Sequence, residues 1–179
     1  MTTIVWDGTT LATDSQISVS GSTYNHAQKL FRLDNGEWVA FAGEQQGWWE
    51  VMEWLNAGAP RDAKPHVTRI EMIIAGPDGV FEMFDRLVRM PVKGPVAYGT
   101  GWKWALAAID HGKSAVEAVE YAATRDHDTG GDVQSPPIAH RPRCRDRAWR
   151  HTRPPPPRSC RDRWRPAPIS SRYRTPRGP

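Results

Sequence analysis

The apolar residues of this chain change their spacing in blocks, and the order of these blocks limits the folds it can adopt. Short strand-like apolar runs come first, at residues 3–6, 11–13, 29–33 and 38–43. A helical repeat follows, then a second group of strand-like runs, and two helical stretches end the patterned region. This grouping predicts packed antiparallel sheets with helices outside them, rather than a parallel sheet of strand–helix–strand units.

Three helices are expected from residue spacing. The first has four apolar residues at i, i+3, i+4 and i+7, the pattern of one helix face: Trp48, Val51, Met52 and Leu55. A second helix is expected over residues 102–110. A third opens with Ser114 and Glu117, which are spaced as a capping-box pair.

Turn signals predict how the strands connect. The Asp-Gly pair at residues 7–8 predicts a hairpin between the first two strands. A second hairpin is expected over residues 69–84, with its turn at 76–79. A short strand is expected at 95–98, and a final strand near 132–134 would complete the sheets.

The composition changes abruptly near residue 134. Residues 1–134 hold 11 Lys and Arg against 18 Asp and Glu, a net charge of −7. Residues 135–179 hold 13 Arg, 11 Pro and only two acidic residues, a net charge of +11. The sequence therefore predicts one domain over 1–134 and an Arg/Pro-rich tail over 135–179. Such a tail cannot bury enough apolar surface to fold, so it is either disordered or the product of a shifted reading frame.

Several classes of protein are excluded by what the sequence lacks. It has no apolar run of about 18 residues that would cross a membrane, and no secretory leader is visible. Cys144 and Cys160 both lie in the tail, so no disulfide or cysteine-based metal site is expected in the domain. The six His residues show no metal-ligand spacing. A cytoplasmic protein is expected.

The chain opens with Met1, Thr2 and Thr3, and removal of Met1 would expose a threonine at the N-terminus. Thr2 would then carry a hydroxyl nucleophile and a free α-amino group on one residue. The hydroxyl is a poor nucleophile unless a base takes its proton. An α-amine, with an ordinary pKa of about 7.7–8.0, can be that base near neutral pH. By itself this is a weak signal, because many chains begin with Met-Thr.

Further motifs strengthen the signal through their order. They are the opening Thr2–Val5, the strand that runs into Asp14-Ser15, the Lys29 strand, the apolar strand ending in Gly43, the turn Tyr98–Gly101 and the segment Arg125–Gly131. Together they resemble the N-terminal nucleophile (Ntn) hydrolases of the proteasome β-subunit type, and most closely the HslV peptidases. The resemblance covers residues 1–134. It implies an α+β fold, a four-layer αββα sandwich of antiparallel sheets.

The resemblance implies a catalytic role for four residues. Thr2 would be the nucleophile, and Lys29 would lower the pKa of its hydroxyl and stabilise the alkoxide. Asp14 would hold Lys29 in place and keep it charged. The backbone N–H of Gly43 would donate to the oxyanion of the tetrahedral intermediate.

The later motifs imply supporting roles. Thr100 stands where the family has a Ser that supports the amine of the nucleophile. Asp126 matches an Asp that orders the site, and Thr129 matches the Ser three residues later. Without the resemblance, Asp126 would be a solvated turn residue after a helix, and Lys29 a solvated strand residue.

One departure from the family bears on assembly. Only about a dozen residues separate the first helix from the strand at 69–75, where larger relatives have further helices that pack the rings and meet an ATPase. This short connection resembles compact HslV-like proteins of phages and prophages. It leaves the ring size and the ATPase partner open.

The function that the resemblance implies is a threonine endopeptidase that cleaves peptides or unfolded proteins as a homo-oligomeric ring. It would need no cofactor or metal of its own, and ATP would enter only through an AAA+ unfoldase partner. Two alternatives stay open. One is a catalytically silent protein of the same fold with a structural or assembly role. The other is a nucleic-acid-binding protein that contacts phosphates through its basic tail.

Overall fold

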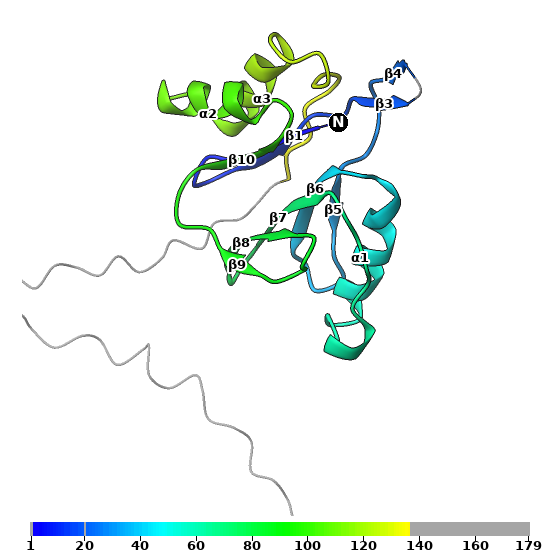
Figure 1. Ribbon diagram of the computed structural model, residues 1–179. Coiled ribbons are helices and arrows are strands. Elements are labelled where there is room, and N and C mark those ends of the chain that lie inside the picture. The colour runs from blue at the N-terminus through cyan, green and yellow to red at the C-terminus, as the bar shows by residue number, and fades with distance from the viewer. Residues whose placement is uncertain (1, 20, 137–179) are drawn as a thin grey trace, which may run out of the picture. The chain divides into compact units, whose positions relative to one another are not determined.

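The computed structural model describes residues 2–19 and 21–136 (Figure 1). The predicted tail lies almost wholly outside these residues. Its boundary, its disorder and the alternative of a shifted reading frame therefore stay predictions.

A three-stranded antiparallel sheet carries the N-terminal segment. Its strands are β1 (Thr3–Trp6), β2 (Leu11–Thr13) and β10 (Val96–Gly99), in the order β10-β1-β2. The predicted hairpin joins β1 to β2, and at its turn the Asp7 carboxylate accepts the amides of Thr9 and Thr10, each at 2.7 Å. The same carboxylate accepts the amide of Ala115 at 2.8 Å. This links the turn to the start of a helix that lies far away in the sequence.

A five-stranded antiparallel sheet forms the second part of the fold. In spatial order its strands are β5 (Leu30–Arg32), β6 (Trp38–Gly43), β7 (Ile70–Gly76), β8 (Gly79–Phe84) and β9 (Met90–Pro91). The hairpin predicted over residues 69–84 is confirmed as β7 and β8, with Gly76 paired to Gly79 at the turn.

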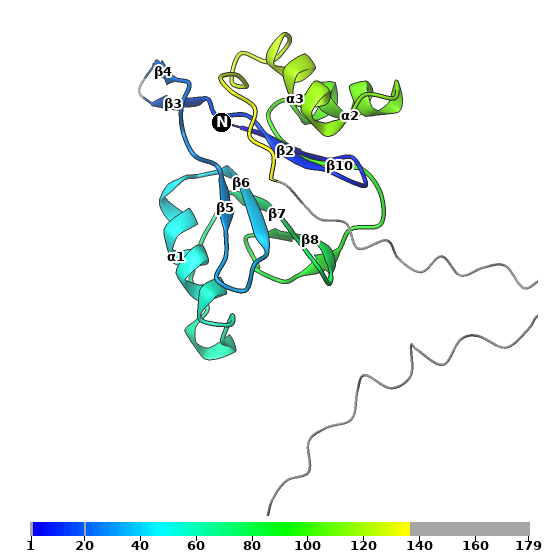
Figure 2. The same ribbon diagram turned by 180° about the vertical axis from the view of Figure 1, so that it is seen from behind.

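The three predicted helices are confirmed as α1 (Gln46–Asn56), α2 (Trp102–Asp110) and α3 (Ala115–Ala123). The predicted capping box is present: Ser114 Oγ accepts the Glu117 amide, and the Glu117 carboxylate accepts the Ser114 amide at 2.9 Å. Figure 2 shows α2 and α3 beside the β10-β1-β2 sheet, and α1 beside β5 and β6.

Alternation along β1 directs its side chains to two different apolar clusters. Ile4 packs with residues of the five-stranded sheet such as Ile73. Val5, on the opposite face of β1, packs with residues of α2 and α3. A third cluster joins α1 to the five-stranded sheet. The predicted mixed fold of antiparallel sheets with helices packed on them is confirmed.

The structure differs from the sequence prediction at four places. The hairpin of β3 (Ile17–Val19) and β4 (Ser22–Tyr24) is not predicted, because its residues are largely exposed and lack apolar alternation. The strand expected near 132–134 is reduced to a single bridge, in which the Thr13 amide donates to the Gln134 carbonyl at 2.9 Å. The short 3₁₀ helix Arg61–Ala63 and β9 are also unpredicted. Within the described residues, every helix is too short or too polar to cross a membrane.

Candidate active site

The peptide bond between Thr2 and Thr3 is fixed on both sides at the start of β1. The Thr2 carbonyl accepts the amide of Thr100 at 2.9 Å, and the Thr3 amide donates to Asp14 Oδ1 at 2.9 Å. Thr2 itself is only 1% exposed. Gly99 permits this close approach, because a Cβ at that position would lie 1.7 Å from the Thr2 carbonyl oxygen. The strand thus presents Thr2 in one defined position.

Asp14 and Lys29 form a fully buried ion pair beside this peptide. Both residues are 0% exposed, and Lys29 Nζ donates to Asp14 Oδ1 at 2.9 Å. This is the same oxygen that accepts the Thr3 amide. The ammonium group therefore lies within two hydrogen-bond lengths of the peptide that follows Thr2. Lys29 Nζ also donates to the carbonyl of Gln16.

The Asp14 carboxylate organises the backbone around the ion pair. Its second oxygen accepts the amide of Gln16 at 3.2 Å and the amide of Gly130 at 3.1 Å. These donors, together with the Thr3 amide and the Lys29 ammonium group, fix the carboxylate in one direction. Asp14 therefore links β1, β5 and the segment around Gly130 at one point.

Burial lowers the pKa of Lys29, because the charged ammonium is removed from water. The negative charge of Asp14 and its hydrogen bond oppose this shift and favour the protonated form. A cation held here without screening by water interacts strongly with any negative charge that develops nearby. This environment suits the stabilisation of an alkoxide better than a surface ion pair would.

A second group of hydroxyls and a carboxylate lies next to Thr3. Asp126 Oδ2 accepts the hydroxyl of Thr100 at 2.6 Å and the hydroxyl of Thr129 at 2.5 Å. The Thr129 hydroxyl is also 2.6 Å from the Thr3 hydroxyl. The structure thus brings together Thr100, Asp126 and Thr129, which the sequence analysis singled out separately.

Gly43 lies at the end of β6, at the same end of the sheet as Lys29. The register shows this, because the Phe41 amide donates to the Lys29 carbonyl at 3.0 Å and Gly43 follows two residues later. Gly43 has a φ of +88°, and a Cβ there would lie 1.9 Å from the carbonyl oxygen of Arg69. Only glycine fits this exposed position.

Three residues in this region received no role in the sequence analysis. Thr3, Gln16 and Gly101 all take part in hydrogen bonds of the buried polar cluster. Thr3 stands in the strand that the sequence predicts, but its side-chain partners lie about a hundred residues away. A pattern within one sequence gives no signal for such contacts. Among the described residues, no three His, Cys, Asp or Glu side chains gather in a way that would hold a metal ion.

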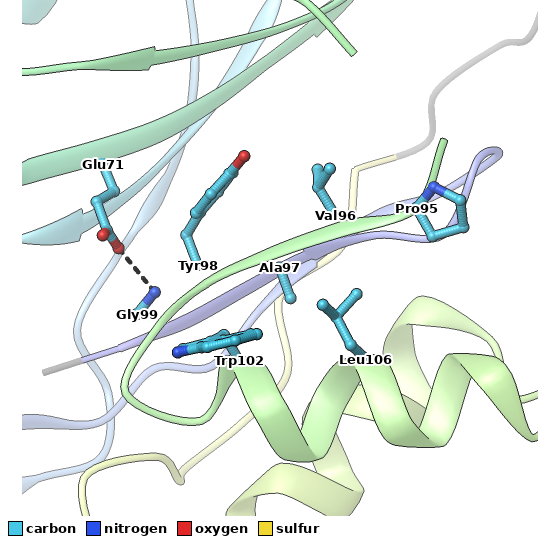
Figure 3. A pocket seen from close by; sticks show the side chains of 8 residues that line it. All are labelled: Glu71, Pro95, Val96, Ala97, Tyr98, Gly99, Trp102 and Leu106. Atoms are coloured by element: carbon cyan, nitrogen blue, oxygen red, sulfur yellow. Dashed lines mark hydrogen bonds between the residues drawn. The ribbon is translucent and has the colours of Figure 1, made fainter. Parts of the chain in front are cut away.

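A separate groove of about 370 Å³ runs along β10, the outer strand of its sheet (Figure 3). Its walls include Tyr98, Trp102 and Leu106, and the Glu71 carboxylate accepts the Gly99 amide at 2.8 Å. Among the residues that line the groove, Gly99 lies next to Thr2 of the predicted site. Burial and a hydrogen bond to Glu82 raise the pKa of Tyr98 well above its ordinary value, so its hydroxyl stays protonated.

Comparison with known proteins identifies the fold. No protein-family model and no curated protein matches the chain. Among solved structures, BPH from Thiobacillus denitrificans matches with a TM-score of 0.57 and 19% identity, over 75% of this chain and 95% of that chain. BPH in complex with epoxomicin matches with a TM-score of 0.57 and 20% identity, over the same shares of both chains. Eukaryotic HslV from Trypanosoma brucei matches with a TM-score of 0.56 and 21% identity, over 75% of this chain and 97% of that chain. The predicted resemblance is confirmed at the level of the fold, which is HslV-like.

Proposed function

We propose that this chain is a threonine peptidase of the Ntn-hydrolase class that hydrolyses peptide bonds through Thr2 after removal of Met1. One observation carries the proposal: a fully buried lysine, Lys29, shares an oxygen of Asp14 with the peptide that follows Thr2. Desolvating an ammonium group is costly, so a buried pair of this kind is weak evidence for stability. Its position beside the peptide that follows Thr2 gives it a chemical purpose.

The proposed reaction follows from these positions. The α-amine of Thr2 takes the proton of the Thr2 hydroxyl, and the oxygen attacks the substrate carbonyl carbon. The ammonium of Lys29 stabilises the negative oxygen before attack, and the Gly43 amide donates to the oxyanion that forms. The amine then gives its proton to the leaving nitrogen as the peptide bond breaks. Water hydrolyses the resulting ester and restores the Thr2 hydroxyl.

Thr100, Asp126 and Thr129 are proposed to orient this centre. Thr100 does so directly, because its amide binds the Thr2 carbonyl and its hydroxyl binds Asp126. The comparison structures add support. One of them, BPH, has been solved with epoxomicin, and another is an HslV. The three apolar clusters also support the predicted four-layer αββα sandwich.

The remaining parts of the proposal concern the assembly. A peptidase of this fold would act on peptides or unfolded proteins as a homo-oligomeric ring, as the likeness to HslV suggests. An AAA+ ATPase unfoldase that feeds the ring, a compact phage-like version of the assembly and a cytoplasmic location belong to the proposal by analogy. The chain itself would need no cofactor.

The test combines intact mass spectrometry with a covalent probe. The purified full chain is expected to lack Met1 and to gain the mass of one peptide epoxyketone on Thr2. Thr2→Ala should lower peptide hydrolysis by about 10³-fold or more, because no nucleophile remains. Thr23→Ala, on the exposed strand β4, is the matched control and should leave the rate unchanged.

Two results would decide against the peptidase. Retained Met1 with no adduct on folded protein would favour the catalytically silent alternative. Binding of DNA or RNA that is sensitive to salt and lost on deletion of residues 137–179, without any adduct, would favour the nucleic-acid-binding alternative.

A further inference from the structure

We infer that Thr3 is a positioning residue whose hydroxyl connects the main chain after Thr2 to a proton-ordered chain of hydroxyl groups ending on Asp126. The inference deepens the proposed function and rests on it for the catalytic effect. The hydroxyl chain itself is argued from hydrogen bonds alone.

The direction of every proton in this chain follows from the end at Asp126. Asp126 Oδ2 accepts the hydroxyls of Thr100 and Thr129, and a hydroxyl has one proton to donate. The Thr129 hydroxyl donates its proton to Asp126 Oδ2, at 2.5 Å. The contact of 2.6 Å between Thr129 and Thr3 must then be donated by Thr3. The Thr3 oxygen in turn accepts the amide of Gly101 at 3.0 Å.

The hydroxyl groups of Thr3 and Thr129 are tightly enclosed by their neighbours. Thr3 and Thr129 are buried, at 0% and 3% exposure. A Cβ on Gly101 would lie 2.3 Å from the Thr3 oxygen and 2.8 Å from the Thr129 oxygen. The Thr3 hydroxyl is thus enclosed by its partners and cannot contact a substrate.

Thr3 fixes the direction of the polypeptide backbone at its junction with Thr2. Its amide donates to Asp14 and its carbonyl accepts the Asp14 amide at 3.3 Å, so its backbone is held on one side. The hydroxyl holds the side chain against Gly101 and Thr129. Together these contacts fix the residue by both its backbone and its side chain. Since a displacement of about 1 Å at a reacting atom costs about 10²-fold in rate, this anchoring is relevant to Thr2.

The kinetic test compares three variants of the full chain. Thr3→Val keeps the shape of the side chain and removes the hydroxyl, and it is expected to lower kcat for peptide hydrolysis by about 10²-fold with KM unchanged. Thr3→Ser restores the hydroxyl and should recover the rate to within a few-fold. Thr13→Val is the matched control, because Thr13 is equally buried and its hydroxyl donates to the Asp14 carbonyl at 3.3 Å, outside the hydroxyl chain that ends on Asp126. The inference is overturned if Thr13→Val and Thr3→Val reduce kcat equally, or if Thr3→Ser fails to recover it.

A second measurement tests the hydroxyl chain without any activity. Urea unfolding of Thr3→Val, Thr129→Val and the double variant forms a double-mutant cycle. If the hydroxyls form one ordered chain, the unfolding equilibrium constants should depart from additivity by about fivefold or more. If the effects of Thr3→Val and Thr129→Val on stability are additive, the proposed chain of hydroxyl groups is refuted, even if the enzyme is active. If the wild-type protein forms no epoxyketone adduct, the proposed function fails while the cycle still decides whether the chain exists.

Discussion

Lys29, the residue before β5, and Phe41 of β6 are neighbours, and both are fully buried, yet they belong to regions of opposite character. The Phe41 amide donates to the Lys29 carbonyl at 3.0 Å. The Phe41 ring stacks on Trp48 of α1, with centroids 5.5 Å apart, inside the apolar cluster between α1 and the five-stranded sheet. The Lys29 side chain instead meets the carboxylate of Asp14.

The two regions differ in what each requires of its residues. The cluster around Phe41 needs apolar volume, and such volume can be supplied by many combinations of side chains. The cluster around Lys29 needs donors and acceptors in fixed directions, and a single missing partner leaves a buried polar group without a hydrogen bond. The two regions are therefore equally buried but differ in how well they tolerate substitutions. The region with the lower tolerance is the one that holds the proposed chemistry.

The largest effect that separates the two regions should come from Asp14→Ala. This change leaves the Lys29 ammonium buried without its carboxylate and removes the acceptor of the amides of Thr3, Gln16 and Gly130. A loss of about 3–5 kcal/mol in the free energy of unfolding is expected by urea denaturation. Asp78→Ala, in the exposed turn between β7 and β8, should change stability by less than about 0.5 kcal/mol. Equal effects of the two variants would refute the special role of Asp14.

A smaller effect is expected from Glu37, a buried charge in the turn between β5 and β6. Its carboxylate accepts both Arg89 guanidinium nitrogens, at 2.7 Å and 2.8 Å. Glu37→Gln should cost about 1–3 kcal/mol, because one partner of a charged hydrogen-bond pair is neutralised.

The pH dependence of this contribution has a defined sign. The hydrogen bonds from Arg89 hold the pKa of Glu37 below its ordinary value of 4.5, although burial acts in the opposite direction. The stabilisation is therefore complete above pH 4.5 and is lost as the pH falls through the lower pKa of the folded state. Thermal unfolding between pH 3 and 7 should show a shallower acid decline for Glu37→Gln than for Glu120→Gln, an exposed control on α3. Parallel curves would contradict this assignment.

The smallest effect should come from Ile74→Val in the apolar cluster. Ile74 is fully buried on β7, and removal of one methylene from such a site typically costs about 0.5–1.5 kcal/mol. The hydrolysis rate and its pH profile should stay as in the wild type, because no polar partner is lost. A change in kcat would show that the two regions are coupled.

The sequence predicts the apolar region well because one physical signal specifies it. The spacing of Trp48, Val51 and Leu55 marks the buried face of α1, and the structure buries all three. The hairpin of β3 and β4 escapes this method, because its exposed residues carry no apolar period. Strand and helix periodicity thus predict the elements that face a core.

The polar region is predictable only in part and for a different reason. Asp14 and Lys29 stand out through the family resemblance, and the structure does place them in contact. Gln16, whose amide binds Asp14 and whose carbonyl binds Lys29, completes their surroundings but belongs to no motif that the sequence offers. Hydrogen-bond direction becomes visible only once the sheets are assembled.

The burial of Thr2 has a consequence for the biosynthesis of the protein. In the folded chain that still carries Met1, Thr2 is only 1% exposed, so an aminopeptidase has little access to the bond that it would cleave. On the proposed function, maturation therefore has to occur before β1 pairs with β2 and β10, while the N-terminal segment is still free near the ribosome.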